Sequence, residues 1–493
     1  MRRLFAVVVL ALLLLAASLA YNALQLSSRQ IAVTPLPELP IDIDAAAQRL
    51  GAAVRARTIS RDDGRTDSAP AFVELRDLLV HSFPAAHHVL ERELINRTSL
   101  LYTWRGSDPS LAPVMLLAHQ DVVPVAPGTE PDWQQAPFSG AIADGYIWGR
   151  GAWDDKGNLM AILEAVNMLA AQGLQPKRTV YLGFGHDEEI GGEQGARAIA
   201  DVLKSRGVQL DFVLDEGLLV TEGILPGIDA PVALIGIAEK GYLTLDISAE
   251  ATPGHSSMPP ARTAIGALSQ ALVRLDQRQM APQLRGAARQ MFETLAPEFS
   301  GTNRVLFSNL WLFEPLVRRQ LDTLAWGRAM LRTTTALTIV QAGDKDNVLP
   351  GRADAKVNFR LLPGDTIEQV VQRSQDAIAE KDIRVSVSSQ AWNPSLLSSS
   401  QSPSYRLLAQ TIREVFRGAI VAPGLMIGAT DSRRYQDIAA QVYRFTPVRA
   451  RSEDLGRFHG TNERVGVANY VEMIRFYHRL IEQSALAAPA ALH

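Results

Sequence analysis

Hydrophobic and polar positions follow one pattern in the first half of the chain and return to it near the end. Short apolar runs that suit buried strands lie at Val114–His119, Thr179–Gly185 and Asp211–Leu214, and Asn158–Gln172 has apolar residues at helical spacing. Similar patterns resume after about residue 395 and end with Val467–Ile481. This alternation of strands and helices predicts an α/β domain with a mostly parallel central sheet.

The pattern changes between about residues 240 and 392. The predicted elements there are a half-exposed strand at Tyr242–Glu250, a helix at Ala264–Leu275, strands at Ala336–Ala342 and Ala355–Leu361, a helix at Thr366–Ala379 and a strand at Ile383–Ser389. The order β-α-β-β-α-β describes a ferredoxin-like module, here interrupted by a largely helical stretch at about 278–333. We therefore expect one catalytic domain, residues 45–239 and 393–486, with an inserted domain at 240–392.

The N-terminus has a pattern of its own. Arg2 and Arg3 precede an unbroken apolar run from Leu4 to Ala17, and Ser18-Leu19-Ala20 offers a small-x-small cleavage site. Residues 1–24 are therefore a signal peptide or an uncleaved membrane anchor, and both alternatives stay open. Residues 25–44, with their prolines, form a linker. In either case the basic end stays in the cytoplasm and the rest of the chain is exported, membrane-anchored or secreted.

Composition narrows the chemistry. The chain has 493 residues, a formal net charge of −3 and no cysteine. The near-neutral balance gives no basic footprint for nucleic acid. The lack of cysteine excludes disulfides, a thiol nucleophile and thiolate-bound zinc, so any metal must be bound by His, Asp and Glu.

Five short segments rich in His, Asp and Glu follow the predicted strands or lie in loops. They are His119-Gln120-Asp121, Gly149–Gly157, Gly185–Gly192, Asp215-Glu216-Gly217 and Arg457–Glu463. Each has an ordinary structural explanation when taken alone: a core histidine, a turn with a helix N-cap, or a solvated acidic loop. Together they bring two histidines and several carboxylates to the sheet edge where α/β proteins build their sites. This mixture of imidazole and carboxylate suits zinc.

In their order and spacing, the five segments resemble the aminoacylase/carboxypeptidase S family of co-catalytic zinc peptidases, from about residue 45 to 485. Within that family, the segments around Glu188 and Glu216 are most similar to carboxypeptidase S and the secreted N-fatty-acyl-amino-acid hydrolase/synthases. The resemblance implies a zinc-peptidase catalytic domain interrupted by a lid domain, through which two subunits can form a homodimer. It also implies two zinc ions per subunit.

The resemblance further implies roles for individual residues. His119 and Glu216 would bind one zinc, Glu189 and His459 the other, and Asp154 both; Glu188 would be the general base and Asp121 the partner of His119. Asp215 remains an alternative to Glu216. In the lid, His255 of Thr252–Ser257 would stabilise the oxyanion, often in a partner subunit, while Asn347, Arg360 and Thr430 would lie on the side of the substrate carboxylate.

The function that the resemblance implies is hydrolysis of an amide or peptide bond beside a free carboxylate, with a zinc-activated water and Glu188 as the base. The substrate would be a peptide or an N-acyl amino acid, and the same site could run in reverse as a synthase. A narrow-specificity dipeptidase and a non-catalytic binding protein on the same fold are alternatives. A serine hydrolase is disfavoured, because Gly254-His255-Ser256 is not a nucleophile elbow.

Overall fold

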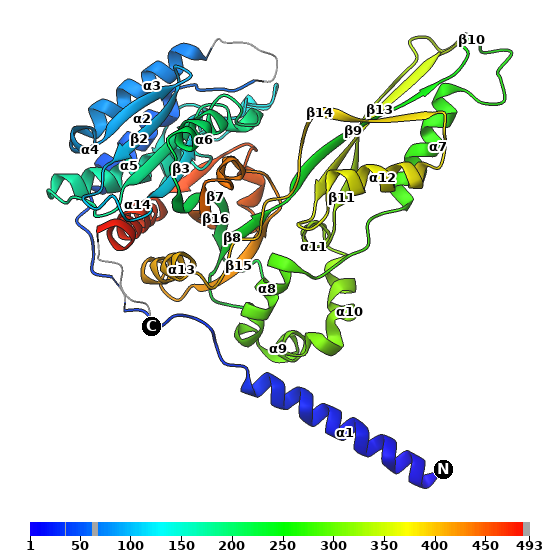
Figure 1. The fold of residues 1–493 in the computed structure, drawn as a ribbon, viewed down its shortest axis with the longest axis horizontal. Coiled ribbons are helices and arrows are strands. Elements are labelled where there is room, and N and C mark those ends of the chain that lie inside the picture. The colour runs from blue at the N-terminus through cyan, green and yellow to red at the C-terminus, as the bar shows by residue number, and fades with distance from the viewer. Residues whose placement is uncertain (35, 62–67, 487–493) are drawn as a thin grey trace.

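An eight-stranded sheet forms the centre of the larger part of the molecule (Figure 1). The computed structural model describes residues 1–34, 36–61 and 68–486. The sheet has the order β1-β2-β6-β3-β7-β16-β8-β15, and the pairs β3–β6, β3–β7, β7–β16 and β8–β15 are parallel. Its strands are β1 (Glu91–Ile95), β2 (Ser99–Trp104), β3 (Val114–His119), β6 (Val180–Gly185), β7 (Leu210–Thr221), β8 (Val232–Glu239), β15 (Ile420–Met426) and β16 (Ala439–Ala450). The predicted α/β class with a mostly parallel sheet is confirmed.

Strand β3 shows why its sequence is a continuous apolar run. Leu116 and Ala118 belong to the main hydrophobic core, whereas Met115 and Leu117 belong to a second core on the opposite face of the sheet. Successive side chains of a strand point to opposite faces, so a strand covered on both sides needs apolar residues at every position.

Helices cover both faces of this sheet. Helix α6 (Ala196–Ser205) contributes to the second core. The main core is shared by α2 (Ile43–Arg55), α3 (Ala69–Ser82), α4 (Pro84–Val89), α5 (Lys156–Ala171), α13 (Pro403–Val415) and α14 (Val467–Ile481). A small sheet of order β17-β5-β4 joins Arg464–Gly466, Tyr146–Trp148 and Ile142–Ala143.

A second module extends away from the central sheet (Figure 1). Its elements are β9 (Gly241–Glu250), α7 (Ala264–Gln277), β11 (Thr334–Ala342), β13 (Arg352–Leu361), α12 (Ile367–Ile378) and β14 (Ile383–Trp392). Its antiparallel sheet has the order β11-β13-β9-β14 and a hydrophobic core of its own. The strands β10 (Gly254–His255) and β12 (Val348–Leu349) pair at the end of the module far from the central sheet.

The stretch between α7 and β11 contains four α-helices, which are α8 (Gly286–Leu295), α9 (Gly301–Ser308), α10 (Leu310–Leu321) and α11 (Ala325–Leu331). Although this helical insert interrupts the second module in sequence, its core includes Ile420 and Ala422 of β15 and so joins the central sheet. Helix α1 (Arg2–Gln25) projects from the insert (Figure 1) and is long and apolar enough to cross a membrane.

Candidate metal centre

Neighbouring parallel strands bring the acidic and histidine segments to one edge of the central sheet. His119 is the last residue of β3, and Glu188 and Glu189 begin a short 3-10 helix just after β6. Because β3 pairs in parallel with β6 and with β7, the carboxyl ends of these strands lie together.

Strand β7 departs from the sequence-based expectation. It was expected to end at Leu214, yet it continues to Thr221 and includes Glu216. The pairing with β16 moves from Asp215 opposite Arg444 to Leu218 opposite Phe445, so Glu216 and Gly217 form a bulge. Gly217 has φ of 149°, and a Cβ there would lie 2.7 Å from Cβ of Arg444, so only glycine fits. A bulge of this kind redirects a side chain, here Glu216.

Two groups of three side chains could each hold a metal ion, and they share Asp154. The first group is His119, Asp154 and Glu216, and the second is Asp154, Glu189 and His459; within each group the ligand atoms lie within 4.8 Å of one another. Nε2 of His119 is 3.0 Å from Oδ1 of Asp154, and Nε2 of His459 is 2.7 Å from Oδ2 of the same carboxylate. In the first group, Oε1 of Glu216 lies 3.6 Å from Nε2 of His119. In the second group, Oε2 of Glu189 lies 3.2 Å from Nε2 of His459.

The charges of this centre fit a divalent cation. Burial and the neighbouring Asp154 raise the pKa of Glu216 to about 8 and that of Glu189 to about 7. Burial opposes ionisation of Asp154 too, but hydrogen bonds from His119 and His459 outweigh it and lower the pKa of that carboxyl. Buried carboxylates so close together ionise readily only beside positive charge, and Oε1 of Glu189 has no hydrogen-bond partner among the described residues. Imidazole with carboxylate is a donor set that suits zinc.

Asp121 lies behind the first group of ligands. Its Oδ1 is 3.4 Å from Nδ1 of His119, and its carboxylate also accepts hydrogen bonds from the hydroxyl of Ser60 at 2.7 Å and from the backbone N–H groups of Glu188 and Glu189, both at 3.2 Å. The one carboxylate therefore orients an imidazole and positions the segment that carries both glutamates. Such outer partners set the tautomer and direction of a metal-binding histidine.

A buried ion pair between Arg150 and Glu463 holds the loop before Asp154. The sequence predicted no role for either residue. Oε1 of Glu463 accepts the backbone N–H groups of Gly151, Trp153 and Asp154 at 2.9–3.1 Å, and its other oxygen accepts from Arg150 at 2.5 Å. Both partners lie within the acidic and glycine-rich segments that the sequence singled out. The presence of Arg150 and Glu463 in these segments was the signal that the sequence offered. Their pairing could not be predicted, because they are more than 300 positions apart in the chain.

Glu188 lines a cavity of about 380 Å³ that is also lined by Asp154, Glu189, Glu216 and His459 of the two candidate ligand groups. Burial, followed by the nearby Glu216, Asp431 and Glu189 carboxylates, raises the pKa of Glu188 well above its ordinary value. Glu188 belongs to neither ligand group, so its carboxyl is available for proton transfer.

One wall of this cavity is a stack of aromatic rings and guanidinium groups at the base of the second module. Tyr242 and Trp392 face each other across β9 and β14, with their rings 4.8 Å apart. Arg360 lies over the Tyr242 ring at 4.8 Å, and Arg433 lies over the Trp392 ring at 4.5 Å. Arg433 also donates to the backbone oxygens of Thr430 and Gly191, whereas the described residues give the Arg360 guanidinium no ion-pair partner.

The remaining predicted residues belong to neither candidate ligand group. His255 is exposed on β10, pairs with Val348 and accepts from the Ser257 hydroxyl or donates to it at 2.8 Å. Asn347 lies beside it, with its backbone oxygen accepting from Ser256 at 3.1 Å. Thr430 is fully buried, donates to Glu239 at 3.0 Å and does not line the cavity; Gly428, Ala429 and Arg433 from the same segment do. Asp215 accepts the backbone N–H of Ser432 at 2.7 Å and belongs to neither ligand group.

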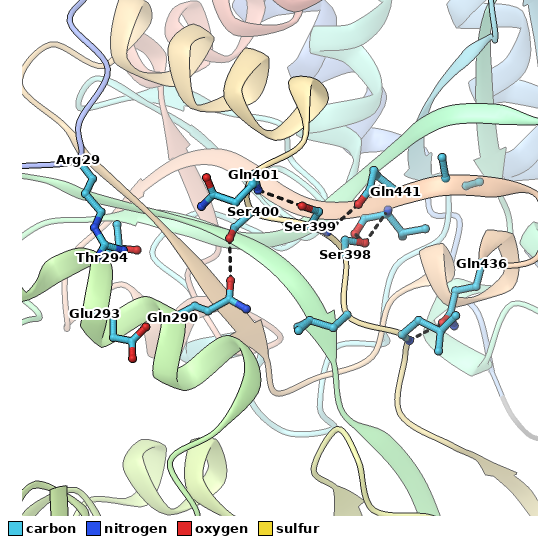
Figure 2. Close-up of a pocket in the computed structure, with 15 residues that line it drawn as sticks. Arg29, Gln290, Glu293, Thr294, Ser398, Ser399, Ser400, Gln401, Gln436 and Gln441 are labelled. Atoms are coloured by element: carbon cyan, nitrogen blue, oxygen red, sulfur yellow. Dashed lines mark hydrogen bonds between the residues drawn. The ribbon is translucent and has the colours of Figure 1, made fainter. Parts of the chain in front are cut away.

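A hollow of about 530 Å³ lies elsewhere, between α8, residues 396–401 and β16 (Figure 2). Its polar side chains bond one another: Ser400 donates to Gln290 at 2.7 Å, and the backbone N–H of Ser399 donates to Gln441 at 2.7 Å. Because its lining has no cluster of metal ligands or acids, the 380 Å³ cavity is the candidate active site.

Comparison with known proteins agrees with this geometry. The family model for peptidase family M20/M25/M40 matches residues 115–483. The chain belongs to this peptidase family. It is 42% identical, over 89% of its length and 85% of the relative's, to the N-fatty-acyl-amino acid synthase/hydrolase of Xenopus tropicalis. It is 40% identical to probable carboxypeptidase S-like 2 of Dictyostelium discoideum, over 94% of this chain and 91% of that one.

Among solved structures, an M20 family metallo-carboxypeptidase of Sulfolobus solfataricus has the same fold, with a TM-score of 0.63 at 18% identity, covering 89% of this chain and 98% of that one. The chain is therefore a metal-dependent hydrolase of peptide or linear amide bonds, and its predicted family is confirmed.

Proposed function

We propose that this chain binds two zinc ions and hydrolyses, or in reverse forms, the amide bond of N-acyl amino acids. His119 and Glu216 would hold one ion, Glu189 and His459 the other, and Asp154 would bridge them. The observation that carries this proposal is the sharing of Asp154 by two ligand groups beside a cavity that contains the free carboxyl of Glu188.

When bound, the zinc ions supply Lewis acidity that polarises the amide carbonyl and makes water more acidic. The chain itself moves the proton. Glu188 takes it from the attacking water and returns it to the leaving amine, a task for which its raised pKa is suited. Asp121 keeps His119 oriented and holds the backbone of Glu188 in place through its hydrogen bonds.

Arg360 supports recognition of a free carboxylate. Its guanidinium lines the cavity over the Tyr242 ring, and burial and the nearby Arg433 lower its pKa. A partly buried cation without an internal counter-ion favours an anionic partner, and guanidinium binds carboxylates in a two-pronged geometry. The carboxylate of the product amino acid fits this position.

The rest of the cavity wall supports an apolar acyl group over a dipeptide. Trp153, Ile190, Met426 and Phe458 contribute apolar surface. The acids that line the cavity among the described residues are those of the metal centre and Glu188, which leaves none to bind the free ammonium of a dipeptide. The curated relative from Xenopus tropicalis is named for N-fatty-acyl amino acids, which agrees with this preference.

The second module would act as a lid. His255 and Asn347 are at its outer end, so they would approach a metal centre by closure of the module or from a second subunit of a homodimer. There His255 would donate a hydrogen bond to the oxyanion. The module would thus serve both closure and dimerisation, and the apolar helix α1 would direct the catalytic parts out of the cytoplasm.

Kinetics with paired substrates test this function. Zinc-loaded protein is assayed with N-acyl amino acids of increasing chain length, the corresponding amino-acid amides, and dipeptides. We expect kcat/KM to be greatest for long acyl chains with a free carboxylate. In Arg360→Met, KM for the substrate with a free carboxylate should rise by roughly 10-fold or more, while the small rate with the corresponding amide stays unchanged. The reason is that only the carboxylate substrate loses an ionic contact with the Arg360 guanidinium.

Arg352→Met is the matched control, because Arg352 is an exposed arginine on the same strand and pairs with Asp354. Equal effects of Arg360→Met on acid and amide would remove Arg360 from carboxylate binding. Higher kcat/KM for dipeptides than for every acyl amino acid would establish the dipeptidase alternative instead.

A further inference from the structure

Helix α10 of the helical insert has two apolar faces. Leu310, Val317 and Leu321 are buried against the insert core. On the opposite side, Trp311 is 64% exposed and Leu316 is 52% exposed. A surface helix of a soluble domain normally carries polar residues there, so this second apolar face calls for a partner.

The exposed apolar residues of α10 form one surface, which we call the insert face. Positions 311, 312, 315 and 316 share one side of a helix of 3.6 residues per turn. The insert face therefore consists of Trp311, Leu312, Pro315 and Leu316. Leu324 and Trp326 are exposed too, but they line a small apolar cavity of about 100 Å³ together with Val317 and Leu321 of the buried side of α10.

The insert face adjoins the end of helix α1. Arg304 of α9 donates to the backbone oxygens of Ala23 at 2.8 Å and of Leu26 at 3.0 Å. Asn309, immediately before α10, is fully buried, donates to the backbone oxygen of Leu19 at 3.1 Å and accepts from Asn22 at 2.8 Å. The indole of Trp311 donates to that same Asn309 side chain at 3.3 Å. The bilayer-length helix therefore ends beside α9 (Figure 1) and is hydrogen-bonded to Asn309, the residue between α9 and α10.

Aromatic and basic residues around the insert face match a membrane surface. Trp311 and Tyr21 are both exposed near the junction of α1 with the insert, and Trp and Tyr favour the boundary between hydrocarbon and water. Arg319, on the same side of α10, and Arg328 of α11 are exposed and have no ion-pair partner among the described residues. Such arginines favour anionic lipid headgroups.

We propose that α1 remains attached as a membrane span and that the insert face rests on the outer surface of the same bilayer. The bilayer, and not a second copy of the chain, is the occupant because α1 is hydrogen-bonded to Arg304 of α9 and to Asn309, the residue immediately before α10. This contact would hold the catalytic domain at the membrane, where amphiphilic molecules concentrate, and it goes beyond the catalytic function proposed above.

The cysteine-free sequence permits a site-specific test with the full chain. Leu316→Cys, carrying a spin label, is reconstituted in nanodiscs that contain one chain each, and collisions with oxygen (in lipid) and with a water-soluble nickel chelate are measured. We expect several-fold more oxygen contact and several-fold less nickel contact than for a label at Leu94→Cys. Leu94 is also exposed but lies on β1, at the opposite edge of the sheet from β15.

Three outcomes would overturn the proposal. Equal accessibility of the two labels would mean that the insert face remains in water. Protection only in vesicles crowded with protein, together with dipolar coupling between labels, would identify a second copy as the occupant. A mature N-terminus after Ala20 in the native membrane would mean that α1 is removed as a signal peptide.

Charge reversal tests the headgroup contact separately. Adding anionic lipid to the nanodiscs should deepen the Leu316→Cys label, and the double variant Arg319→Glu/Arg328→Glu should abolish that response. Arg384→Glu, at an exposed arginine on β14 of the second module, should leave it intact. A response to anionic lipid that survives the double variant would contradict the role of the two arginines, whereas hydrolysis of a short-chain soluble substrate should be unchanged in every variant.

Discussion

Glu188 and Glu189 are neighbours in sequence with different surroundings. Oε2 of Glu189 is 3.2 Å from Nε2 of His459 within a ligand group, whereas Glu188 faces the cavity and is no member of either group. The hydrogen bonds of Asp121 to both backbone N–H groups hold the two side chains in these separate positions. One short segment can therefore supply both a ligand and a base.

This separation predicts different effects of the same substitution at the two positions. Glu188→Gln should keep its metal and lose roughly 10²–10⁴-fold in turnover, which is the usual contribution of a positioned base. Glu189→Gln should lose metal as well as activity, because an amide oxygen is a weaker ligand than a carboxylate. Elemental analysis beside steady-state kinetics checks both, and full metal occupancy in Glu189→Gln with depletion in Glu188→Gln would reverse the assignment.

Glu463 should act on the metal through Asp154. Glu463→Gln replaces the carboxylate that accepts three backbone N–H groups and pairs with buried Arg150, so the loop that aims Asp154 should loosen. We expect metal affinity to fall by about 10- to 100-fold, as for other outer partners of metal ligands. Competition with a chelator measures this, Glu453→Gln at an exposed site is the control, and unchanged affinity would leave Glu463 a purely structural residue.

At the scale of elements, β3 and β7 place their candidate ligands differently. Strand β3 ends at His119, as its apolar run predicts, whereas β7 continues past Glu216 through a bulge against β16. The second module joins the catalytic part at the aromatic and guanidinium stack of Arg360, Tyr242, Trp392 and Arg433. Motion of that module would therefore change the cavity wall and the position of His255 together.

The outer end of the module predicts a shared active site. His255→Ala should lower kcat and kcat/KM together by about 10²–10³-fold with little change in metal content, because the proposed hydrogen bond forms only in the transition state. If the module dimerises, mixing His255→Ala with Glu188→Gln should restore activity, since a mixed dimer contains one complete site.

Subunit exchange is verified with two affinity tags before activity is measured. Absence of rescue in verified mixed dimers would mean that His255 acts within its own chain after closure of the module. Normal turnover of His255→Ala would exclude the residue from the mechanism.

At the scale of the whole molecule, metal binding should stabilise the fold as well as enable catalysis. The candidate ligands come from segments between His119 and His459, so ions that bind only the folded chain would connect distant parts of the sequence. We expect close to two zinc ions per chain, and exhaustive chelation should abolish activity and lower the melting temperature. Full activity after chelation, or a single ion at saturation, would contradict the two-zinc centre.

Export is the second prediction at this scale. Arg2 and Arg3 precede an apolar helix that can span a membrane, so the catalytic parts should lie outside the cytoplasm. A reporter fused after residue 60 that works only outside the cytoplasm would agree, and a reporter that works only inside would contradict the orientation. The N-terminal sequence of the mature protein then distinguishes a cleaved signal from an anchor.

The sequence by itself determined the α/β class, the ferredoxin-like order of the second module and the acidic and histidine segments that the structure brings together in the two candidate ligand groups. These features depend on local information: periodicity of apolar residues, and acids and histidines placed where strands end. The limits of β3 and α14 agree with the sequence pattern to the residue, because a buried strand and an amphipathic helix are each specified by their own side chains.

Only the tertiary structure decided which residues meet. Tertiary packing places Glu463 against the loop before Asp154 and forms the bulge that directs Glu216. It also buries Thr430 in the interior and places Arg433 in the cavity wall. It also packed the helical insert on β15 and fastened α1 to it. Each of these depends on contacts between segments far apart in the chain, and such contacts are set by how whole elements pack, which no local pattern of residues encodes.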